Sequence, residues 1–261
     1  DATVVAANCA RAQEALRVLE EFGRSCDPEL ARVAEHCRYR LYDLETRLLA
    51  DQSRRQRLAA ERLYLITSPV PQLRSVVEQA LQAGVKLVQH RSKLTDDLPR
   101  YQEAVALRDL CAAHGALFIV NDRVDLALAV EADGVHLGQG DLPPAQARRL
   151  LGPDRLIGRS THAPAQLQQA MADGCDYAGV GPLQATPTKP GREPVGLDYL
   201  RQAAQIATIP HYAIGGVDVQ LLPALLEAGG PHCRVAVVRA VMEAADPAAA
   251  ARQLLELLAD G

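Results

Sequence analysis

From residue 61 onward the sequence repeats one pattern: a short apolar run, then polar or glycine residues, then a stretch with helical spacing. The apolar runs are Leu63 to Thr67, Val85 to His90, Leu117 to Asn121, Gly134 to Leu137, Leu156 to Gly158, Tyr177 to Val180, His211 to Ile214 and Val235 to Val238. Strands that alternate with helices in this order form parallel sheets. Eight such units within about 200 residues predict an α/β fold, a closed (β/α)8 TIM barrel.

A doubly wound open sheet is the alternative fold for such an alternation. These sheets usually have fewer strands, and their dinucleotide-binding members carry the pattern G-x-G-x-x-G after the first strand. No such pattern follows Leu63 to Thr67. The barrel is therefore the expected fold.

Residues 1 to 60 differ from the rest of the chain, because they show helical spacing throughout and contain no strand-like run. Apolar residues recur there at three- and four-residue steps, as in amphipathic helices. Asp27-Pro28 is typical of a helix start, with Asp as the N-cap and Pro at the first helical position. We therefore predict a small all-α segment, a helical hairpin over residues 1–60, before a barrel domain over residues 61–261.

Two polar stretches of this segment have simple interpretations. The stretch Arg54 to Arg57 is interpreted as a solvated linker. Repetition at every third position favours a solvated helix face over a ligand-binding edge. The residues with that repetition are Asn8, Arg11, Glu14, Arg17 and Glu20.

Charge and composition exclude several classes of partner. The formal net charge is −4 and no basic stripe alternates with aromatic residues, so nucleic acid is not an expected partner. No apolar run approaches the roughly 18 residues that a membrane span needs. The six cysteines form no C-x-x-C pair, which favours reduced thiols over zinc or disulfides. We expect a cytoplasmic protein without a membrane segment.

Polar residues gather where the predicted strands end. In an extended chain Gln89, Arg91 and Lys93 would share one side, while His90 would take the other. A strand that simply runs out into solvent explains this pentad equally well. The other strands end similarly, in Asn121-Asp122, Gly138 to Asp141, Ser160 to His162, Gln184 to Gly191 and Gly215-Gly216. Since the active site of a barrel lies at the C-terminal ends of its strands, we predict a functional site there.

Asp122 and Asp141 follow neighbouring predicted strands. Two nearby carboxylates are stable when a cation lies between them or when one takes up a proton. Mg²⁺ prefers one or two protein carboxylates together with water and phosphate oxygens, and Arg91, Lys93 and Lys189 are available to bind phosphates. The pair predicts a Mg²⁺ site, with helix capping by both aspartates as the alternative.

A second anion site is predicted at the last two strands. Gly215-Gly216 lets the backbone approach a ligand, and Val238-Arg239 precedes a helix whose N-terminus offers free N–H donors. Two phosphate-bearing ligands and one metal indicate transfer between two substrates, with pyrophosphate as the leaving group. No nucleophile–base pair is visible at the strand ends, and His162 is interpreted as a structural or substrate contact.

Six strand-end motifs occur in order between residues 62 and about 245. They are Gln89-x-Arg91-x-Lys93, Asn121-Asp122-Arg123, Gly134 to Asp141, Ser160-Thr161-His162, Thr186 to Lys189 and Ile214 to Gly216. Together they resemble the motifs of the thiamine-phosphate synthase family. The resemblance implies a transferase of thiamine biosynthesis that joins an aminopyrimidine methyl diphosphate to a thiazole ethyl phosphate. The products would be thiamine phosphate and pyrophosphate, with CO2 also released from a carboxylated thiazole.

The same resemblance implies a role for each matched residue. Asp122 and Asp141 would bind Mg²⁺. The pyrimidine diphosphate would be held by Gln89, Arg91, Lys93, Asn121, Ser160 and Lys189, of which Arg91, Lys93, Ser160 and Lys189 would serve catalysis. The thiazole phosphate would lie against Thr186, Thr188, Gly216, Val238 and Arg239. Position 239 departs from the pattern, because many members have Ser there. Residues 1–60 resemble the N-terminal extension of longer members.

Two other functions compete with this interpretation. A thiazole tautomerase on the same barrel resembles the synthase but lacks much of its diphosphate-binding set, which is present here. A catalytically inactive barrel would act as a scaffold or regulator through residues 1–60, but the retained charged residues argue against it. A homo-oligomer is compatible with the sequence.

Overall fold

The computed structural model describes the backbone of residues 2–185 and 193–260, with their side chains except at 2, 3, 47–53 and 260. The chain divides into two compact units, residues 1–56 and residues 57–261. The division falls between residues 56 and 57, inside a helix.

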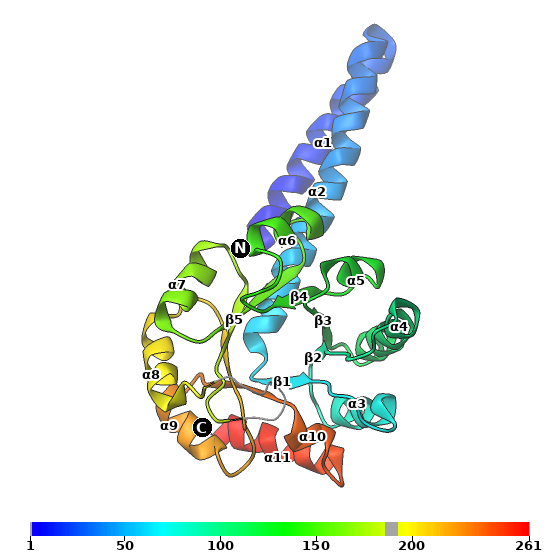
Figure 1. Cartoon of the computed structure of the whole chain (residues 1–261). Coiled ribbons are helices and arrows are strands. Elements are labelled where there is room, and N and C mark those ends of the chain that lie inside the picture. Colours follow the sequence, from blue (N-terminus) through cyan, green and yellow to red (C-terminus); the bar gives the residue numbers. More distant parts are fainter. Residues whose placement is uncertain (1, 186–192, 261) are drawn as a thin grey trace. The chain divides into compact units, whose positions relative to one another are not determined.

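In the described part of the larger unit, eight parallel strands close into a barrel (Figure 1). Neighbouring strands pair in chain order, and the last strand closes the barrel onto the first, with Leu63 in register with Val235. The predicted (β/α)8 barrel is confirmed. The strands are β1 (Leu63–Ile66), β2 (Leu87–His90), β3 (Leu117–Asn121), β4 (Gly134–Leu137), β5 (Leu156–Thr161), β6 (Tyr177–Val180), β7 (His211–Ile214) and β8 (Arg234–Val237).

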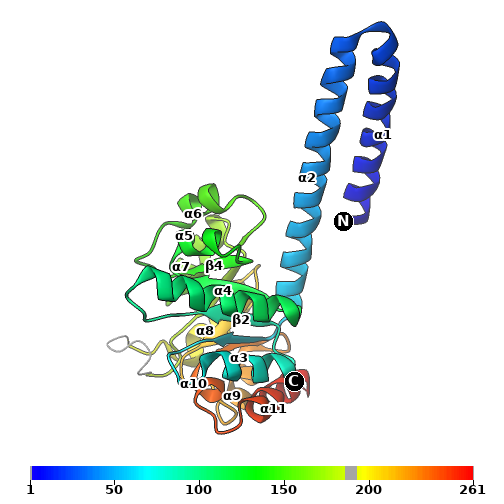
Figure 2. The same ribbon diagram turned by 90° about the vertical axis from the view of Figure 1, so that its right-hand side faces the viewer.

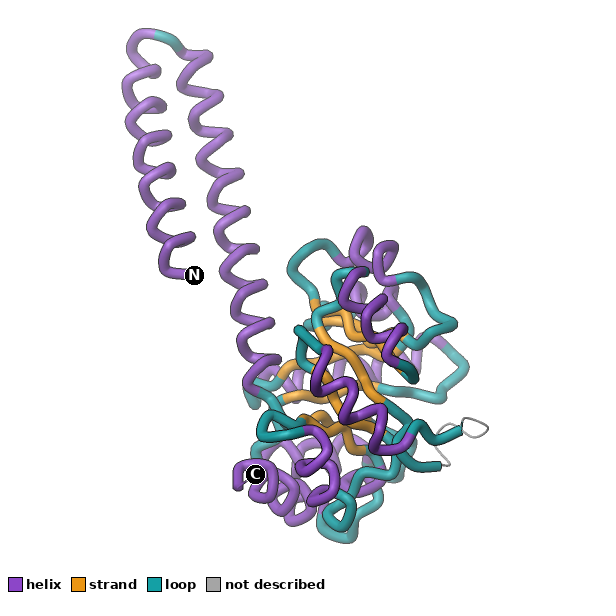
Figure 3. Tube along the Cα trace, turned by 90° about the vertical axis from the view of Figure 1, so that its left-hand side faces the viewer, coloured by secondary structure: helices purple, strands orange, loops and turns teal. Residues whose placement is uncertain are grey.

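Helices surround the strands of this unit, as the ribbon in Figure 2 and the tube in Figure 3 show. They are α3 (Leu73–Gln82), α4 (Asp97–Ala113), α5 (Val124–Ala129), α6 (Pro144–Leu151), α7 (Pro164–Ala172), α8 (Gly196–Ile206), α9 (Leu222–Gly229), α10 (Arg239–Met242) and α11 (Pro247–Asp260). Among the helices in the described ranges, none has the length and apolar composition that a membrane crossing requires.

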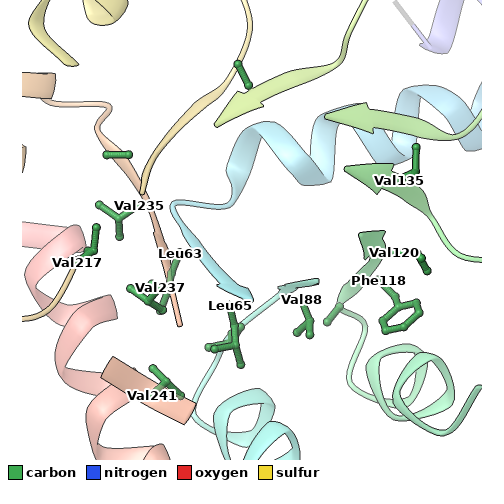
Figure 4. Packing of buried hydrophobic residues seen from close by; sticks show 14 of the residues in the cluster. Leu63, Leu65, Val88, Phe118, Val120, Val135, Val217, Val235, Val237 and Val241 are labelled. Carbon is green, nitrogen blue, oxygen red and sulfur yellow. The ribbon is translucent and has the colours of Figure 1, made fainter. Parts of the chain in front are cut away.

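The two faces of the barrel wall carry separate apolar clusters, because successive side chains of a strand point to opposite faces. Outward-facing residues such as Leu65, Val88 and Val120 join the helices in one large cluster (Figure 4). The inward-facing cluster is smaller and contains tyrosines. Its members are Leu58, Tyr64, Ile66, Leu87, Leu117, Ile119, Leu156, Tyr177, Tyr212 and Ala236.

The last turn of α2 (Pro28–Ala60) closes the N-terminal end of the barrel. Leu58 is buried in the inward-facing cluster, and the Tyr212 hydroxyl donates toward the carbonyl oxygens of Leu58 (3.2 Å) and Glu61 (2.9 Å). The interpretation of Arg54 to Arg57 as a linker is therefore wrong. The helix continues through this stretch, because Arg and Gln are good helix formers.

The smaller unit contains α1 (Ala2–Cys26) and most of α2. The Asp27 carboxylate accepts hydrogen bonds from the backbone N–H groups of Glu29 (3.1 Å) and Leu30 (3.2 Å), so the predicted helix start is confirmed. The expectation of a solvated face is wrong at Glu20, which is buried. The Glu20 carboxylate accepts hydrogen bonds from Arg24 (2.6 Å) on its own helix and from Arg38 (3.0 Å) on α2.

Candidate active site

The C-terminal ends of the strands surround a cavity of about 410 Å³. Its walls come from strands that are far apart in sequence, which the closed barrel brings together. The predicted site residues that line this cavity are Gln89, Arg91, Asn121, Ser160, Gly216, Val238 and Arg239. The cavity thus lies at the end of the barrel where the sequence predicts a functional site.

The end of β2 places neighbouring polar residues on opposite faces of the wall. Gln89 points inward, is 1% exposed and donates a hydrogen bond from its amide to the Tyr64 hydroxyl (2.7 Å). His90 points outward, where its Nε2 lies 2.8 Å from a carboxylate oxygen of Glu103 on α4. The alternation inferred from the sequence is therefore present at these two residues.

Arg91 and Lys93 lie beyond the last residue of β2 and are not held by its alternation. The Arg91 backbone N–H donates to the Thr67 hydroxyl (2.9 Å), and its side chain lines the cavity. Lys93 does not line this cavity. It lines a neighbouring hollow, which also includes Arg91, Ser68 and Glu103. Gln89 therefore lines the cavity and Lys93 lines the neighbouring hollow, while Arg91 lines both.

Asp122 and Asp141 follow the adjacent strands β3 and β4, and neither is among the residues that line the cavity. Asp122 is exposed and has a left-handed backbone with φ of 61°. One Asp141 carboxylate oxygen accepts the Gly138 backbone N–H at 2.6 Å. No group of three or more His, Cys, Asp or Glu suited to a metal occurs among the described residues. Two carboxylates are still a sufficient protein contribution for Mg²⁺.

Sequence reasoning gave His136 no role, although the residue lies at the centre of the site. Its Nε2 is 2.9 Å from the Ser160 hydroxyl and its Nδ1 is 3.2 Å from the Tyr177 hydroxyl. The inward register of His136, two residues before Gly138, is the signal that could have identified it. His162 lines the same cavity, and its ring is hydrogen-bonded to the Gly181 carbonyl oxygen.

The opposite wall of the cavity is made by the ends of β7 and β8. Gly215 and Gly216 have φ of 107° and 74°, values that favour glycine. A Cβ on Gly215 would lie 2.7 Å from Leu183 N, so only glycine lets this turn pack against the chain that follows β6. Val238 precedes α10 and Arg239 is its first residue.

Two carboxylates that the sequence reasoning did not select also line the cavity. Asp218 accepts the backbone N–H groups of Gln220 (3.0 Å) and Leu221 (2.9 Å), so one of its oxygens caps the turn that leads into α9. Glu243 follows α10. Both lie in turns that flank helices and not at the ends of strands. The remaining predicted residues, Thr186, Thr188 and Lys189, lie outside the described residues.

Comparison with known protein families identifies the barrel. A family model described as thiamine monophosphate synthase matches residues 63–241, which is more than half of the chain. The chain belongs to this family. A second family model, described as the ThiD2 family, matches residues 1–47. Membership of the thiamine monophosphate synthase family makes the chain a transferase, so the expectation of an enzyme with small-molecule substrates is confirmed.

Curated relatives resemble both units of this family member. The thiamine-phosphate synthase of Prochlorococcus marinus (strain MIT 9313) is 55% identical over 263 residues, covering 98% of this chain and 74% of that protein. The thiamine-phosphate synthase of Gloeobacter violaceus is 55% identical over 258 residues, covering 99% of this chain and 75% of that protein. The similarity therefore extends beyond the barrel into residues 1–56.

A solved structure supports the same assignment for the fold. The thiamine phosphate pyrophosphorylase from Pyrococcus furiosus superposes with a TM-score of 0.71 at 34% sequence identity. The superposition covers 78% of this chain and 98% of that protein. The match thus corresponds in extent to the barrel of this thiamine monophosphate synthase family member.

Proposed function

We propose that the chain joins an aminopyrimidine methyl diphosphate to a thiazole ethyl phosphate and releases thiamine phosphate and pyrophosphate. A carboxylated thiazole would also lose CO2. The observation that carries this proposal is the composition of the cavity. One wall has Gln89, Arg91, Asn121 and Ser160 at the ends of β2, β3 and β5, and the other has two glycines and the start of α10. Such a cavity can hold two phosphate-bearing ligands side by side.

The first wall suits the pyrimidine diphosphate. Arg91 is the cation on this wall among the described residues, and a guanidinium can bind two phosphate oxygens at once. Lys93 lines the hollow that adjoins Arg91, where a long diphosphate would reach it. Asn121 and Ser160 supply neutral hydrogen-bonding groups. Lys189 is proposed as a further cation for the departing diphosphate.

The second wall suits the thiazole phosphate. Gly215 and Gly216 present backbone without side chains, so an oxyanion can approach the chain closely. The N-terminus of α10 adds backbone N–H groups, and Arg239 adds a charged donor at the rim. Thr186 and Thr188, which follow β6 in the sequence, are proposed to complete this wall.

The donor set at the ends of β3 and β4 suits Mg²⁺, since both groups are hard carboxylates on adjacent strands. Asp122 is exposed, and Asp141 has one oxygen engaged by Gly138 and a second that remains for a ligand. We propose that these two residues hold the ion. When bound, Mg²⁺ would neutralise charge on the diphosphate.

The residues of the cavity can then assist the substitution in three ways. Arg91 stabilises the negative charge that grows on the departing diphosphate oxygen. The cavity walls keep the thiazole nitrogen aligned with the pyrimidine methylene carbon. A strong general base is unnecessary, because the attacking nitrogen carries a lone pair and the electron-rich aminopyrimidine can bear positive charge at its methylene carbon.

The proposal is tested by product formation from both substrates with Mg²⁺, and by omitting each component in turn. We expect equal amounts of thiamine phosphate and pyrophosphate only when all three are present. Arg91→Ala should lower kcat/KM roughly tenfold to a hundredfold, as for loss of a hydrogen bond to a charged group. Arg149→Ala, at an exposed position on α6, is the matched control and should have no effect.

Metal dependence is tested by Asp122→Asn and Asp141→Asn. Each should raise the Mg²⁺ concentration that gives half-maximal turnover, whereas the control Asp173→Asn, at the end of α7, should not. Unchanged metal dependence in both site variants would exclude these ligands. Isomerisation of the thiazole without joining would instead identify a tautomerase.

A further inference from the structure

A row of buried hydrogen bonds crosses the floor of the cavity. The Gln89 amide nitrogen lies 2.7 Å from the Tyr64 hydroxyl, which lies 2.8 Å from the Tyr177 hydroxyl. The row continues from Tyr177 to His136 Nδ1 (3.2 Å) and from His136 Nε2 to the Ser160 hydroxyl (2.9 Å). We call these five residues the buried hydrogen-bond chain. Both of its ends, Gln89 and Ser160, line the cavity.

The two tyrosines of the buried hydrogen-bond chain are shielded from water, whereas His136 also lines the cavity. Tyr64 and Tyr177 are 1% and 0% exposed, and His136 is 9% exposed. Burial raises the pKa of both tyrosine hydroxyls above the usual value, so each keeps its hydrogen at neutral pH. Both tyrosine hydroxyls must then find their partners within the protein, because an unpaired buried donor or acceptor costs about 1–3 kcal/mol.

Counting hydrogens gives the chain a direction. Each tyrosine hydroxyl has one hydrogen to donate, and a neutral imidazole has one N–H. If the Gln89 amide donates to Tyr64, Tyr64 donates to Tyr177 and Tyr177 donates to His136 Nδ1. His136 must then carry its hydrogen on Nε2 and donate it to Ser160. The Ser160 hydroxyl hydrogen is left to point into the cavity, where an anionic ligand would accept it.

A glycine on β5 leaves space for one member of the buried hydrogen-bond chain, Tyr177. A Cβ on Gly158 would lie 2.5 Å from the Tyr177 hydroxyl oxygen and would overlap its ring. The third tyrosine of the interior, Tyr212, packs edge-on against both Tyr64 and Tyr177. Its hydroxyl points to the other end of the barrel and donates to the carbonyls of Leu58 and Glu61. Tyr212 is therefore a matched tyrosine outside the chain.

We propose that Tyr64, Tyr177 and His136 are positioning residues, which fix His136 as the Nε2–H tautomer and make Ser160 a hydrogen-bond donor toward a phosphate-bearing ligand. The same order leaves the side-chain amide oxygen of Gln89, at the other end of the buried hydrogen-bond chain, as an acceptor for the ligand. Reversal of the amide would reverse every link and turn Ser160 away from the ligand. The buried hydrogen-bond chain thus couples two ligand contacts, at Gln89 on β2 and at Ser160 on β5. Its role toward substrate rests on the proposed function, whereas the tautomer does not.

The tautomer is tested without substrate by ¹⁵N NMR of histidine-labelled protein, with the His136 signals assigned from a His136→Gln variant. We expect His136 to be protonated on Nε2 in the unsubstituted protein. Tyr177→Phe keeps the ring and removes the link, so its signals should shift toward the other tautomer or a mixture. Tyr212→Phe should leave them unchanged. A His136 protonated on Nδ1 in the unsubstituted protein, or no change in Tyr177→Phe, would overturn the proposal.

Kinetics test whether the chain acts through Ser160. Tyr177→Phe should lower kcat/KM for the pyrimidine diphosphate about tenfold, with KM for the thiazole phosphate unchanged. The double variant Tyr177→Phe/Ser160→Ala should be no slower than Ser160→Ala alone, because residues that act as a unit are not additive. If the loss of kcat/KM in the double variant equals the product of the losses in the two single variants, Tyr177 does not act through Ser160. If the expected NMR result is obtained but the unsubstituted protein forms no product, the proposed reaction is wrong and the positioning of Ser160 stands.

Discussion

The inner and outer faces of the barrel wall are made by the same strands but contain different chemistry. On the outer face, residues such as Val88, Phe118 and Val120 pack against helices in a continuous apolar cluster. On the inner face, Gln89 and Asn121 occupy the adjacent positions on the same strands and line the cavity. One residue along a strand thus separates a packing position from a ligand-facing position.

The difference follows from what each face contacts. The outer face packs against helices and the segments that flank them, so apolar side chains gain most by burial there, about 25 cal/mol per Å². The inner face opens to a cavity at one end, and its polar groups must be hydrogen-bonded to remain buried. We therefore expect substitutions on the outer face, or in the apolar part of the inner face, to lower stability with little effect on catalysis. Substitutions of polar residues that line the cavity should affect catalysis more than stability.

The largest expected effect is on the outer face. Phe118→Ala removes a fully buried ring and should lower the free energy of unfolding by about 3–5 kcal/mol, measured by denaturant titration. The kcat of the folded fraction should remain close to that of the unsubstituted protein. Phe118→Leu is the control and should cost less. A large loss of kcat in a folded Phe118→Ala protein would contradict the assignment of packing alone to the outer face.

The N-terminal end of the inner face gives a second prediction. Deleting residues 1–60 removes Leu58, whose side chain is buried in the inward-facing cluster, and should cost the barrel about 2–5 kcal/mol. Deleting residues 1–56 keeps Leu58 and should preserve both stability and product formation. The two truncated proteins are compared by thermal unfolding and by turnover. Equal stability would show that Leu58 does not close the barrel, and an inert but folded 57–261 protein would place residues 1–56 in the activity.

A smaller effect is expected on the inner face of β5, where Gly158 lies against Tyr177. Gly158→Ala places a methyl group against the Tyr177 ring and should cost about 1–3 kcal/mol, as overpacking does. Gly140→Ala is the matched control, because a Cβ there meets nothing within 4 Å. Denaturant midpoints of the two variants provide the measurement. Equal midpoints would mean that Tyr177 moves aside without cost.

The smallest effect concerns His90, a polar residue on the outer face. Burial lowers the pKa of His90 below its usual value of 6.5, although the hydrogen bond to Glu103 opposes this shift and nearby Arg100 adds to it. The unfolded chain then binds a proton more readily than the folded one, so His90 should reduce stability as the pH falls below about 6.5. We expect His90→Gln to lose less stability between pH 7.5 and 5.5 than the unsubstituted protein. Equal losses of stability in the two proteins over this pH range would show that His90 does not contribute to the pH dependence.

The sequence predicted the architecture well, because strand and helix periodicities are local. The strand positions, the Asp27 cap and the placement of Gln89 and His90 on opposite faces all follow from spacing. Lys93 could not be placed in the same way, because β2 ends at His90 and alternation stops with the strand.

Residues that depend on distant partners were harder to predict. Glu20 looked like a surface residue until α2 brought Arg38 against it. The role of His136 depends on Tyr177 and Ser160, which come from two other strands. No local pattern encodes such a set, since it forms only when the barrel closes.

The most direct test of the account uses two neighbouring residues of β2, Val88 on the outer face and Gln89 on the inner face. Unfolding free energy and kcat/KM for the pyrimidine diphosphate are measured for Val88→Ala and for Gln89→Leu. We predict that Val88→Ala loses about 1–3 kcal/mol of stability with kcat/KM within about twofold of the unsubstituted value. Gln89→Leu should instead lose at least about tenfold in kcat/KM while it remains folded. Full activity in Gln89→Leu, or a tenfold loss in Val88→Ala, would contradict the assignment of function to the inner face.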